Sequence, residues 1–375
     1  MPERTNAIIF LAFSGAMASA IFMPNYSELI NINRFGIGII GFAYGIAIFV
    51  SSYHFGRVSD YSSRKKLVSI GLALATLFYF LQIFAGSALI LFTVRFFAGF
   101  SMGIFIPALT AYTYDTGGKL GNFSSYGSLG WAFGSLISGA VAQLGRGYFH
   151  EEFAYKLVFI TSSLLFLIAF FISINLPDIK FKAIRVPLFP LNLVRRNSHI
   201  YIANFLRNLG ANAIWIIFPL YLMTLGANPA WIGIIYLVNT VSQFIIMNKL
   251  DSGIAERFVA FGLTLSTFVF LTFTLVPNFL FFLPVQIALA ASYSLVSVGS
   301  LRYLAENNRE KATSVGILSS STSLAIALGP LIGGAISQLY SFKATMYFAA
   351  ITTAVGLIIY LNGFYYKRAS PDYQN

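Results

Sequence analysis

The chain has 375 residues and no cysteine; 57% of its residues are hydrophobic and only 10% are charged. A soluble domain is about 25% charged, so this composition excludes a water-soluble globular protein, and the lack of cysteine excludes disulfides and thiolate metal sites. The net charge of +12 is expected to face anionic lipid headgroups, so no nucleic-acid partner is needed to explain it.

Apolar segments long enough to cross a bilayer, which takes ~20 residues per helix, follow one another along the chain. We expect an all-α membrane protein with twelve transmembrane helices at approximately 6–28, 36–55, 67–86, 88–112, 124–145, 155–176, 199–223, 230–248, 258–276, 279–300, 313–338 and 343–365. The first segment lacks a small-residue cleavage pattern and is interpreted as a retained span. The basic, proline-containing segment 177–198 is predicted to be a cytoplasmic linker between an N-terminal bundle, 1–176, and a C-terminal bundle, 199–375.

Basic residues are distributed unequally between the two sides of these helices. With a cytoplasmic N-terminus, 18 of the 24 Lys and Arg residues fall in inner segments and four fall in outer loops. Because cytoplasmic loops are enriched in basic residues, we predict a multi-pass protein of the cell membrane with both termini in the cytoplasm. Arg95 and Arg207 lie within spans, whereas every acidic residue lies at or beyond a span end.

The two halves of the chain repeat at a spacing of 195 residues. The stretch GAMASAIFMPNY from Gly15 aligns with GANAIWIIFPLY from Gly210. Further aligned positions are Gly121, Gly130, Gly134 and Gly139 with Gly316, Ala325, Gly329 and Gly334. Pseudo-symmetric six-helix halves are typical of transporters, with the substrate site near mid-membrane between them.

Polar side chains within the spans predict which helices line that site. The interiors of spans 3, 6, 9 and 12 have almost no Asn, Gln or charged residue, and these spans are predicted to face lipid. In the seventh span, five side chains fall within one helical arc, namely Asn204, Arg207, Asn208, Asn212 and Trp215. Candidates on spans 8 and 10 are Tyr236, Asn239, Gln243, Gln286, Tyr293 and Ser297. Interhelical hydrogen bonding is the alternative role for such residues, but five converging groups favour a water-filled cavity at span 7. Arg207 is expected to contact the substrate, unless it only snorkels or bonds to helix carbonyls.

The stretch GRVSDYSSRKK, from Gly56 to Lys66, places five charges in a tight turn between two spans. It resembles the signature loop between helices 2 and 3 of the major facilitator superfamily at Gly56, Asp60, Arg64 and Lys65, and departs from it at Tyr61 and Ser63. The glycines of span 5, and Gly329 with Pro330 in span 11, are similar to a motif of exporters in that family. The segment around Arg95 looks like the helix 4 motif. The resemblance covers the whole chain.

This resemblance implies a cytoplasmic latch. Asp60 would lie against the N-terminus of span 11, where backbone N–H groups favour a carboxylate, and the basic cluster would pair with Asp115. The alternative is that the cations only enforce topology. The candidate gating residues are Gly56, Asp60, Arg64, Lys65, Arg95, Asp115, Gly130, Gly134, Gly329 and Pro330.

These features predict a monomeric secondary transporter that moves a small organic solute, anionic or polar neutral, by alternating access, with a tilt toward export. The sequence has no phosphate-binding loop, and His54, His150 and His199 are scattered, so we expect no enzyme activity, cofactor or metal. One alternative is a proton-coupled multidrug efflux antiporter, although no carboxylate lies inside a span. A second is a non-transporting sensor or scramblase on the same scaffold, although no long soluble appendage favours a sensor.

Overall fold

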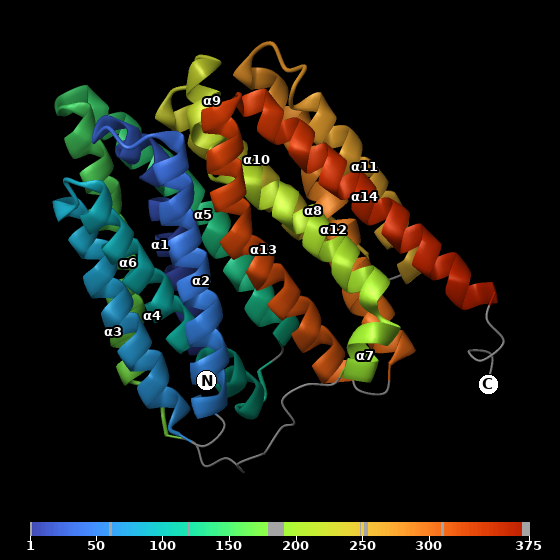
Figure 1. The fold of residues 1–375 in the computed structure, drawn as a ribbon. Helices are drawn as coiled ribbons and strands as arrows, with labels where there is room; N and C mark the ends of the chain where they lie inside the picture. Colours follow the sequence, from blue (N-terminus) through green and yellow to red (C-terminus); the bar gives the residue numbers. More distant parts are fainter. Residues whose placement is uncertain are drawn as a thin grey trace.

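The computed structural model of the protein describes residues 2–59, 62–118, 120–178, 191–247, 249–250, 254–308 and 311–369. These residues are helical almost throughout (Figure 1). The α-helices are α1 (Pro2–Leu29), α2 (Arg34–Ser59), α3 (Arg64–Leu81), α4 (Ala88–Asp115), α5 (Leu120–Tyr148), α6 (Glu151–Ile174), α7 (Leu191–Arg196), α8 (Ser198–Trp215), α9 (Phe218–Thr224), α10 (Pro229–Met247), α11 (Ala255–Thr272), α12 (Phe282–Asn307), α13 (Lys311–Leu339) and α14 (Phe342–Ala369). Two short 3-10 turns, Gln82–Phe84 and Phe279–Phe281, precede α4 and α12.

The helix lengths agree with the twelve predicted spans. Among the described residues, ten helices are long and apolar enough to cross a membrane, and α8 with α9 forms an eleventh span if the bent pair is counted as one. The remaining long helix, α5, has 29 residues and packs beside α1 and α6 of its own bundle. Its many glycine and serine residues lower its hydropathy without shortening it.

The seventh span differs from the prediction of one continuous helix over 199–223. It is divided into α8 and α9, which meet at an angle of 47°. Pro219 lies in the first turn of α9, has no backbone N–H and would clash with the carbonyl of Trp215 in a continuous helix. A short helix, α7, also lies within the segment predicted to be only a linker.

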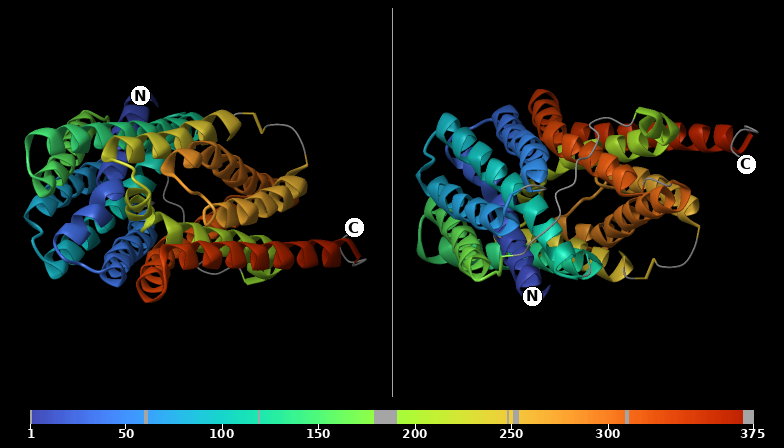
Figure 2. Two further views of the ribbon diagram at one scale, coloured as in Figure 1. Left: turned by 90° about the horizontal axis from the view of Figure 1, so that it is seen from above. Right: turned by 90° about the horizontal axis from the view of Figure 1, so that it is seen from below.

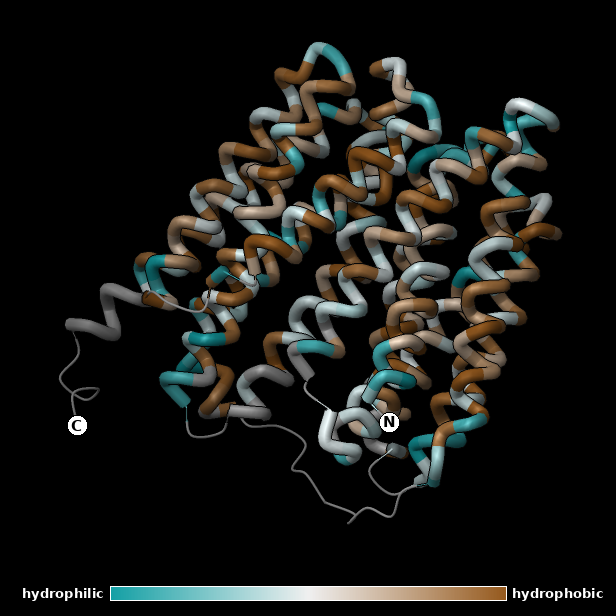
Figure 3. The backbone as a smooth tube through the Cα atoms, turned by 180° about the vertical axis from the view of Figure 1, so that it is seen from behind, coloured by the Kyte–Doolittle hydropathy of each residue, from teal (hydrophilic) through white to brown (hydrophobic). Residues whose placement is uncertain are grey.

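The helices form two bundles, α1–α6 and α8–α14, which lie side by side (Figures 1 and 2). The prediction that spans 3, 6, 9 and 12 face lipid stays a prediction, because α3, α6, α11 and α14 carry exposed large apolar side chains such as Phe171 and Phe268, but other helices do as well, for example α5 at Leu136 and Leu144. Figure 3 shows the same distribution, with hydrophobic residues along the helices and hydrophilic ones concentrated toward their ends.

One contact between the bundles is a close crossing of α2 and α13. A Cβ atom added to Gly38 would lie 2.5 Å from the carbonyl oxygen of Pro330 and 3.0 Å from the Cα of Gly334. Added to Gly334, it would lie 2.5 Å from the carbonyl oxygen of Arg34. Glycine therefore lets the two backbones touch directly.

The second contact, between α5 and α10, repeats this crossing. A Cβ atom on Gly233 would lie 2.6 Å from the carbonyl oxygen of Ser135 and 3.1 Å from the Cα of Gly139. Adding 195 to the residue numbers of Gly38, Ser135 and Gly139 gives Gly233, Pro330 and Gly334. The residues of one crossing are therefore aligned with those of the other by the sequence repeat. Figure 2 shows them on opposite sides of the molecule, with green beside yellow and blue beside red. The predicted repeat thus relates contacts in space as well as residues in sequence.

Both crossings lie in the half of the molecule away from the chain termini. Arg34, the first residue of α2, donates from its Nη1 to the carbonyl oxygen of Ser337 at 3.1 Å, and its backbone N–H donates to Oε1 of Gln338 at 3.0 Å. The bundles are therefore joined at this end. Toward the end that carries α7 and the termini, the ribbons of the two bundles diverge (Figure 1).

Candidate functional site

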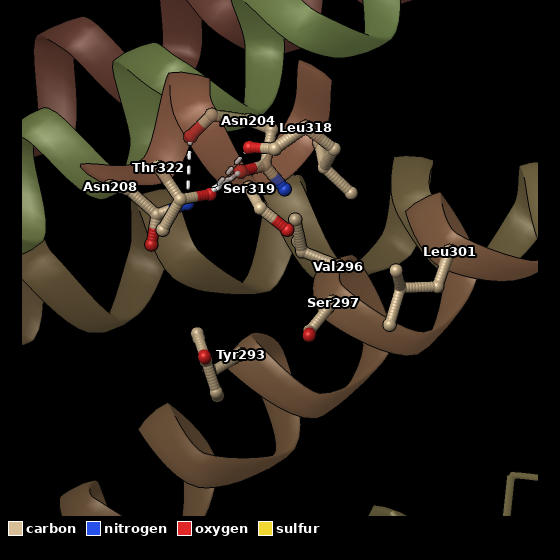
Figure 4. A pocket seen from close by; sticks show the side chains of 9 residues that line it. All are labelled: Asn204, Asn208, Tyr293, Val296, Ser297, Leu301, Leu318, Ser319 and Thr322. Carbon is tan, nitrogen blue, oxygen red and sulfur yellow. Dashed lines mark hydrogen bonds between the residues drawn. The ribbon is translucent and has the colours of Figure 1, made fainter. Parts of the chain in front are cut away.

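A cavity of about 230 Å³ lies in the C-terminal bundle, between α8, α12 and α13 (Figure 4). Its lining residues are Asn204, Asn208, Tyr293, Val296, Ser297, Leu301, Leu318, Ser319 and Thr322. At 1.5 Å per residue, Asn204 is about 9 Å from the start of α8 and Leu301 about 9 Å from the end of α12. The cavity therefore lies in the half of the bundle nearest the termini, opposite the glycine crossings.

Three of the lining side chains form a hydrogen-bonded group that joins α8 to α13. Thr322 donates from Oγ1 to Oδ1 of Asn204 at 3.2 Å, and Asn208 donates from Nδ2 to the same oxygen at 2.7 Å. Within the described part of the chain, the hydroxyls of Tyr293, Ser297 and Ser319 make no hydrogen bond. These hydroxyls can therefore bind a ligand without breaking a contact of the protein.

The lining divides into a polar and an apolar part. Val296, Leu301 and Leu318 provide apolar surface, and the other six residues provide amide or hydroxyl groups. None of the nine side chains is charged at neutral pH. The cavity can therefore hold a molecule with hydrogen-bonding groups on one side and hydrocarbon on the other.

Arg207 does not line this cavity, in contrast to the predicted direct contact with substrate. It is only 3% exposed, its Nε donates to Oγ of Ser266 at 3.2 Å, and its Nη1 makes a long contact of 3.5 Å with Oδ1 of Asn208. Its guanidinium carbon lies 5.1 Å from the ring centre of Tyr293 and 5.7 Å from that of Phe270. Arg207 is thus behind the cavity wall that Asn208 and Tyr293 form.

The side chains of the predicted polar stripe in the seventh span contact different parts of the protein. Asn204 and Asn208 line the cavity, whereas Asn212 donates to the carbonyl oxygen of Asn208 at 2.8 Å and packs against Gly329. Trp215 contacts the ring of Tyr236, with ring centres 5.1 Å apart. The stripe spans roughly 140° of arc and about 16 Å of helix, so its members face different neighbours.

The candidates on α10 and α12 make one hydrogen bond between these helices and one within α10. Asn239 donates from Nδ2 to the carbonyl oxygen of Gln286 at 3.2 Å, and Gln243 donates from Nε2 to Oδ1 of Asn239 at 2.6 Å. Tyr236 and the side chain of Gln286 are buried. Of the predicted residues on these two helices, only Tyr293 and Ser297 line the cavity.

The contribution of α13 to the cavity was not predicted. Leu318, Ser319 and Thr322 line the cavity, and the serine-rich run SSSTS over 319–323 is the sequence signal that could have indicated a polar face there. Val296 and Leu301 carried no such signal, because an apolar lining residue resembles a packing residue.

Among the candidate gating residues, Arg64 and Asp115 form an ion pair. Arg64 also donates to the carbonyl oxygens of Ala111 at 3.1 Å and Ser59 at 3.3 Å. This ion pair joins the start of α3 to the end of α4 within the N-terminal bundle, and it is formed although the ribbons of the two bundles diverge at this end, so its role in gating stays a prediction. Asp60 lies outside the described residues. Gly56 lies in α2 and Lys65 in the first turn of α3; the described part of the chain shows no ion pair for Lys65.

The other candidate gating residues lie inside their bundles. Arg95 is 3% exposed, donates from Nη1 to Oγ of Ser19 at 3.2 Å, and lies 4.3 Å from the ring centre of Tyr44. Gly130 and Gly134 bring α5 against α1, since a Cβ on either would lie 2.3 Å from a carbonyl oxygen of α1. Gly329 makes the corresponding approach of α13 to α8, whereas Pro330 belongs to the inter-bundle crossing.

Two six-helix bundles that are related by a repeat and joined at one membrane side define a secondary transporter fold. The family model of the Major Facilitator Superfamily matches residues 6–253 and 200–375. The chain therefore belongs to the Major Facilitator Superfamily, as the loop and helix motifs implied, and it is a multi-pass membrane transporter.

Similar proteins were found by sequence and by structure. Multidrug resistance protein 2 of Bacillus subtilis (strain 168) is 24% identical, with 93% of this chain and 91% of that protein covered. Quinolone resistance protein NorA of Staphylococcus aureus (strain MRSA252) is 22% identical, with 94% of each covered. The crystal structure of the nucleoside transporter NupG superposes with a TM-score of 0.81 at 15% identity, covering 97% of this chain and 98% of that one. A bacterial homologue of the human lysosomal transporter Spinster, in an inward-facing and occupied conformation, superposes with a TM-score of 0.79 at 13% identity, covering 97% of this chain and 96% of that one.

Proposed function

We propose that this transporter binds a small organic solute in the cavity of the C-terminal bundle and exports it across the cell membrane. The observation that carries the proposal is the position of the cavity. It lies toward the termini, while the opposite half of the molecule is held closed by the glycine crossings and by Arg34. A site accessible from one side and closed on the other is what alternating access requires.

The direction follows from the proposed orientation. With both termini cytoplasmic, as the distribution of basic residues predicts, the cavity belongs to the cytoplasmic half and the structure is inward-facing. A solute would then enter from the cytoplasm. The names of the two sequence relatives, which refer to multidrug and quinolone resistance, support export as the physiological direction.

The substrate class follows from the lining. Amide and hydroxyl groups opposite Val296, Leu301 and Leu318 suit a polar neutral solute with an apolar part. Two bundles with boundaries at 1–176 and 199–375 would rock about this site. Helix α13 would link substrate binding to the movement of the bundles, since it carries both the cavity residue Thr322 and the crossing residue Gly334. We propose that a monomer suffices, because the cavity lies within one chain.

Proton-coupled multidrug efflux is the second candidate function, and the names of the relatives favour it. It predicts that lipophilic cations are the tightest ligands. The uncharged lining and the nearby guanidinium of Arg207 disfavour lipophilic cations, because a buried cation repels a second one.

The experiment combines a thermal-shift screen of the purified protein with transport in proteoliposomes. The screen uses size-matched anionic, neutral and cationic solutes, and the best ligand is then tested with Asn208→Phe, which fills the cavity. Ile202→Phe is the matched control, because Ile202 is on the same helix and 43% exposed. We expect Asn208→Phe to abolish binding and transport and Ile202→Phe to retain both. Equal transport by the two variants would show that the cavity is not the substrate site, and a preference for lipophilic cations would favour multidrug efflux.

A further inference from the structure

Two residues that line the cavity, Asn208 and Tyr293, also lie next to the guanidinium of Arg207. Asn208 and Tyr293 line the cavity on one side and contact Arg207 on the other, at 3.5 Å for Oδ1 of Asn208 and 5.1 Å for the ring centre of Tyr293. A change of rotamer in either residue would bring the charge to the surface of the cavity.

The surroundings of Arg207 leave much of its hydrogen-bonding capacity unused. A guanidinium has five N–H donors and no acceptor, and the described residues provide two acceptors, Oγ of Ser266 and Oδ1 of Asn208. None of the ion pairs among the described residues involves Arg207. A charge at this depth is costly and usually has a partner or a function. Phe270 and Tyr293 give it only the faces of their rings.

Tyr293 is held less firmly than Asn208. Asn208 is fixed by hydrogen bonds from Nδ2 to Oδ1 of Asn204 at 2.7 Å and to its carbonyl oxygen at 2.8 Å. The half-buried Tyr293 makes no hydrogen bond within the described part of the chain, and Figure 4 shows it across the open cavity from Asn208 and Thr322. Its ring can therefore move into the cavity volume without breaking a hydrogen bond.

A similar pair in the other bundle is locked. Tyr44 covers Arg95 with a ring distance of 4.3 Å, but its hydroxyl is hydrogen-bonded to that of Tyr79 at 3.0 Å. Neither Arg95 nor Tyr44 is among the residues that line the cavity. The two bundles thus contain the same arginine-under-tyrosine arrangement, once fixed and once beside open space.

We propose that Tyr293 is a movable cover over Arg207, and that together they form a concealed subsite for the anionic group of a substrate. The inference rests on the proposed function of the cavity and extends its substrate class to solutes that join an apolar part to one carboxylate. The apolar part would lie against Val296 and Leu318, and the carboxylate would displace the ring of Tyr293 and pair with the guanidinium. Tyr293 would then be the residue that determines whether acids are accepted.

The test compares the binding of 2-naphthoate with that of its uncharged amide, 2-naphthamide, to the purified full-length protein by calorimetry. We expect the acid to bind about tenfold more tightly than the amide, which corresponds to ~1.4 kcal/mol. Arg207→Met should reduce this ratio to about one while leaving the amide affinity within about twofold, and Arg207→Lys should keep part of it, because a lysine retains the charge but loses the planar fork. Tyr293→Ala should raise the ratio above that of the unaltered protein by several-fold. Tyr44→Ala, which uncovers Arg95, is the matched control and should leave the ratio of acid affinity to amide affinity unchanged.

Thermal unfolding of each variant shows whether the variant is folded. If Arg207→Met does not fold, the Tyr293→Ala variant still tests the proposal. A ratio that is the same in the unaltered protein, Arg207→Met and Tyr293→Ala would overturn the subsite, as would an increase in Tyr44→Ala equal to that in Tyr293→Ala. If the amide binds and Asn208→Phe abolishes that binding, the proposed cavity stands even when the subsite fails. If neither compound binds to the unaltered protein or to Tyr293→Ala, both proposals are wrong.

Discussion

The two bundles differ in packing and in polarity at one set of equivalent positions. At the repeat spacing of 195, the N-terminal bundle has Ile9, Phe13 and Gly127 where the C-terminal bundle has Asn204, Asn208 and Thr322. In the first set, a Cβ on Gly127 would lie 3.1 Å from Cδ2 of Phe13 and 3.7 Å from Cγ1 of Ile9, so apolar side chains cover the glycine. In the second set, the three side chains are hydrogen-bonded and line a cavity.

The comparison shows where a duplicated fold can change. The inter-bundle crossings have kept their register, because two backbones in contact leave no room for a Cβ at Gly38, Gly139, Gly233 or Gly334. The bundle interiors have diverged, because volume can be filled by one large apolar side chain or left open among small polar ones. In the proposed function, the binding chemistry therefore belongs to the half in which small polar side chains leave this volume open.

The largest effect is expected from breaking the crossings themselves. A valine at Gly334 would place Cβ 2.5 Å from the carbonyl oxygen of Arg34, and a valine at Gly139 would place it 2.9 Å from that of Pro229. Overpacking costs about 1–3 kcal/mol, so both substitutions should destabilise the observed state, Gly334→Val more than Gly139→Val, and reduce transport by about tenfold or more. Transport in proteoliposomes measures the loss. Because the chain has no cysteine, a cysteine introduced by Met223→Cys can be labelled selectively, and its labelling rate measures how often the crossings open. Gly147→Val is the control, since a Cβ there meets nothing within 4 Å; transport equal to the control would refute the role of the crossings.

The next effect concerns the loops that follow the second helix of each half. Asp60 fits the family motif, whereas its eroded copy in the second half retains Asp251 without the leading glycine; both aspartates lie outside the described residues. We expect Asp60→Asn to insert normally, to favour the state open at the cytoplasmic side and to reduce transport severalfold. Asp251→Asn should have a smaller effect. Unchanged transport by Asp60→Asn at normal expression would reject the latch.

Ion pairs give a comparison of stability between the halves. Asp115→Asn removes the partner of the nearly buried Arg64 and should lower the free energy of unfolding by about 1.5–3 kcal/mol, because hydrogen bonds to charged groups are among the stronger ones. Glu306→Gln removes the i,i+4 partner of Arg302, and Glu306 is 52% exposed, so its effect should be about 0.3–0.5 kcal/mol. Thermal unfolding in one detergent measures both, and equal shifts would contradict the difference in burial.

The polar group of the cavity allows a finer test. Thr322→Val keeps the shape but removes the hydrogen bond to Oδ1 of Asn204, which should weaken binding of a polar neutral ligand by about 1 kcal/mol, or roughly fivefold. Thr93→Val is the control, because the exposed hydroxyl of Thr93 bonds only to the carbonyl of Leu89 in its own helix. Calorimetry with the best ligand of the thermal-shift screen decides the matter; equal affinity in the two variants would exclude Thr322 from the site.

The smallest effect is expected at the two aligned prolines. Pro24 lies inside the continuous helix α1, so Pro24→Ala can restore one backbone hydrogen bond, worth about 0.5–1.5 kcal/mol. Pro219 is in the first turn of α9, where the N–H would lack a helical partner anyway, so Pro219→Ala should change the free energy of unfolding by less. The melting temperatures of the two variants compare them, and a larger gain for Pro219→Ala would show that α8 and α9 can rejoin.

Much of the fold was predictable from the sequence because a bilayer imposes simple conditions. Segment length and hydropathy indicate the spans, and the spacing of 195 relates the halves. The resemblance to the family implied that the basic cluster pairs with Asp115, and the structure shows that Arg64 is the partner. The break between α8 and α9 was not predicted, although Pro219 was visible, because Pro24 at the aligned position does not break α1.

What the sequence by itself determined is therefore the positions of the spans, the duplication and the family. Only the tertiary structure decided which polar residues form a site. A helical stripe of roughly 140° faces several neighbours at once, and the side of α8 that meets α12 and α13 depends on how the helices pack. The same packing placed Arg207 behind Tyr293 and added Thr322 of α13 to the cavity, because contacts between distant helices are set by the shapes of both surfaces and not by the periodicity of either one.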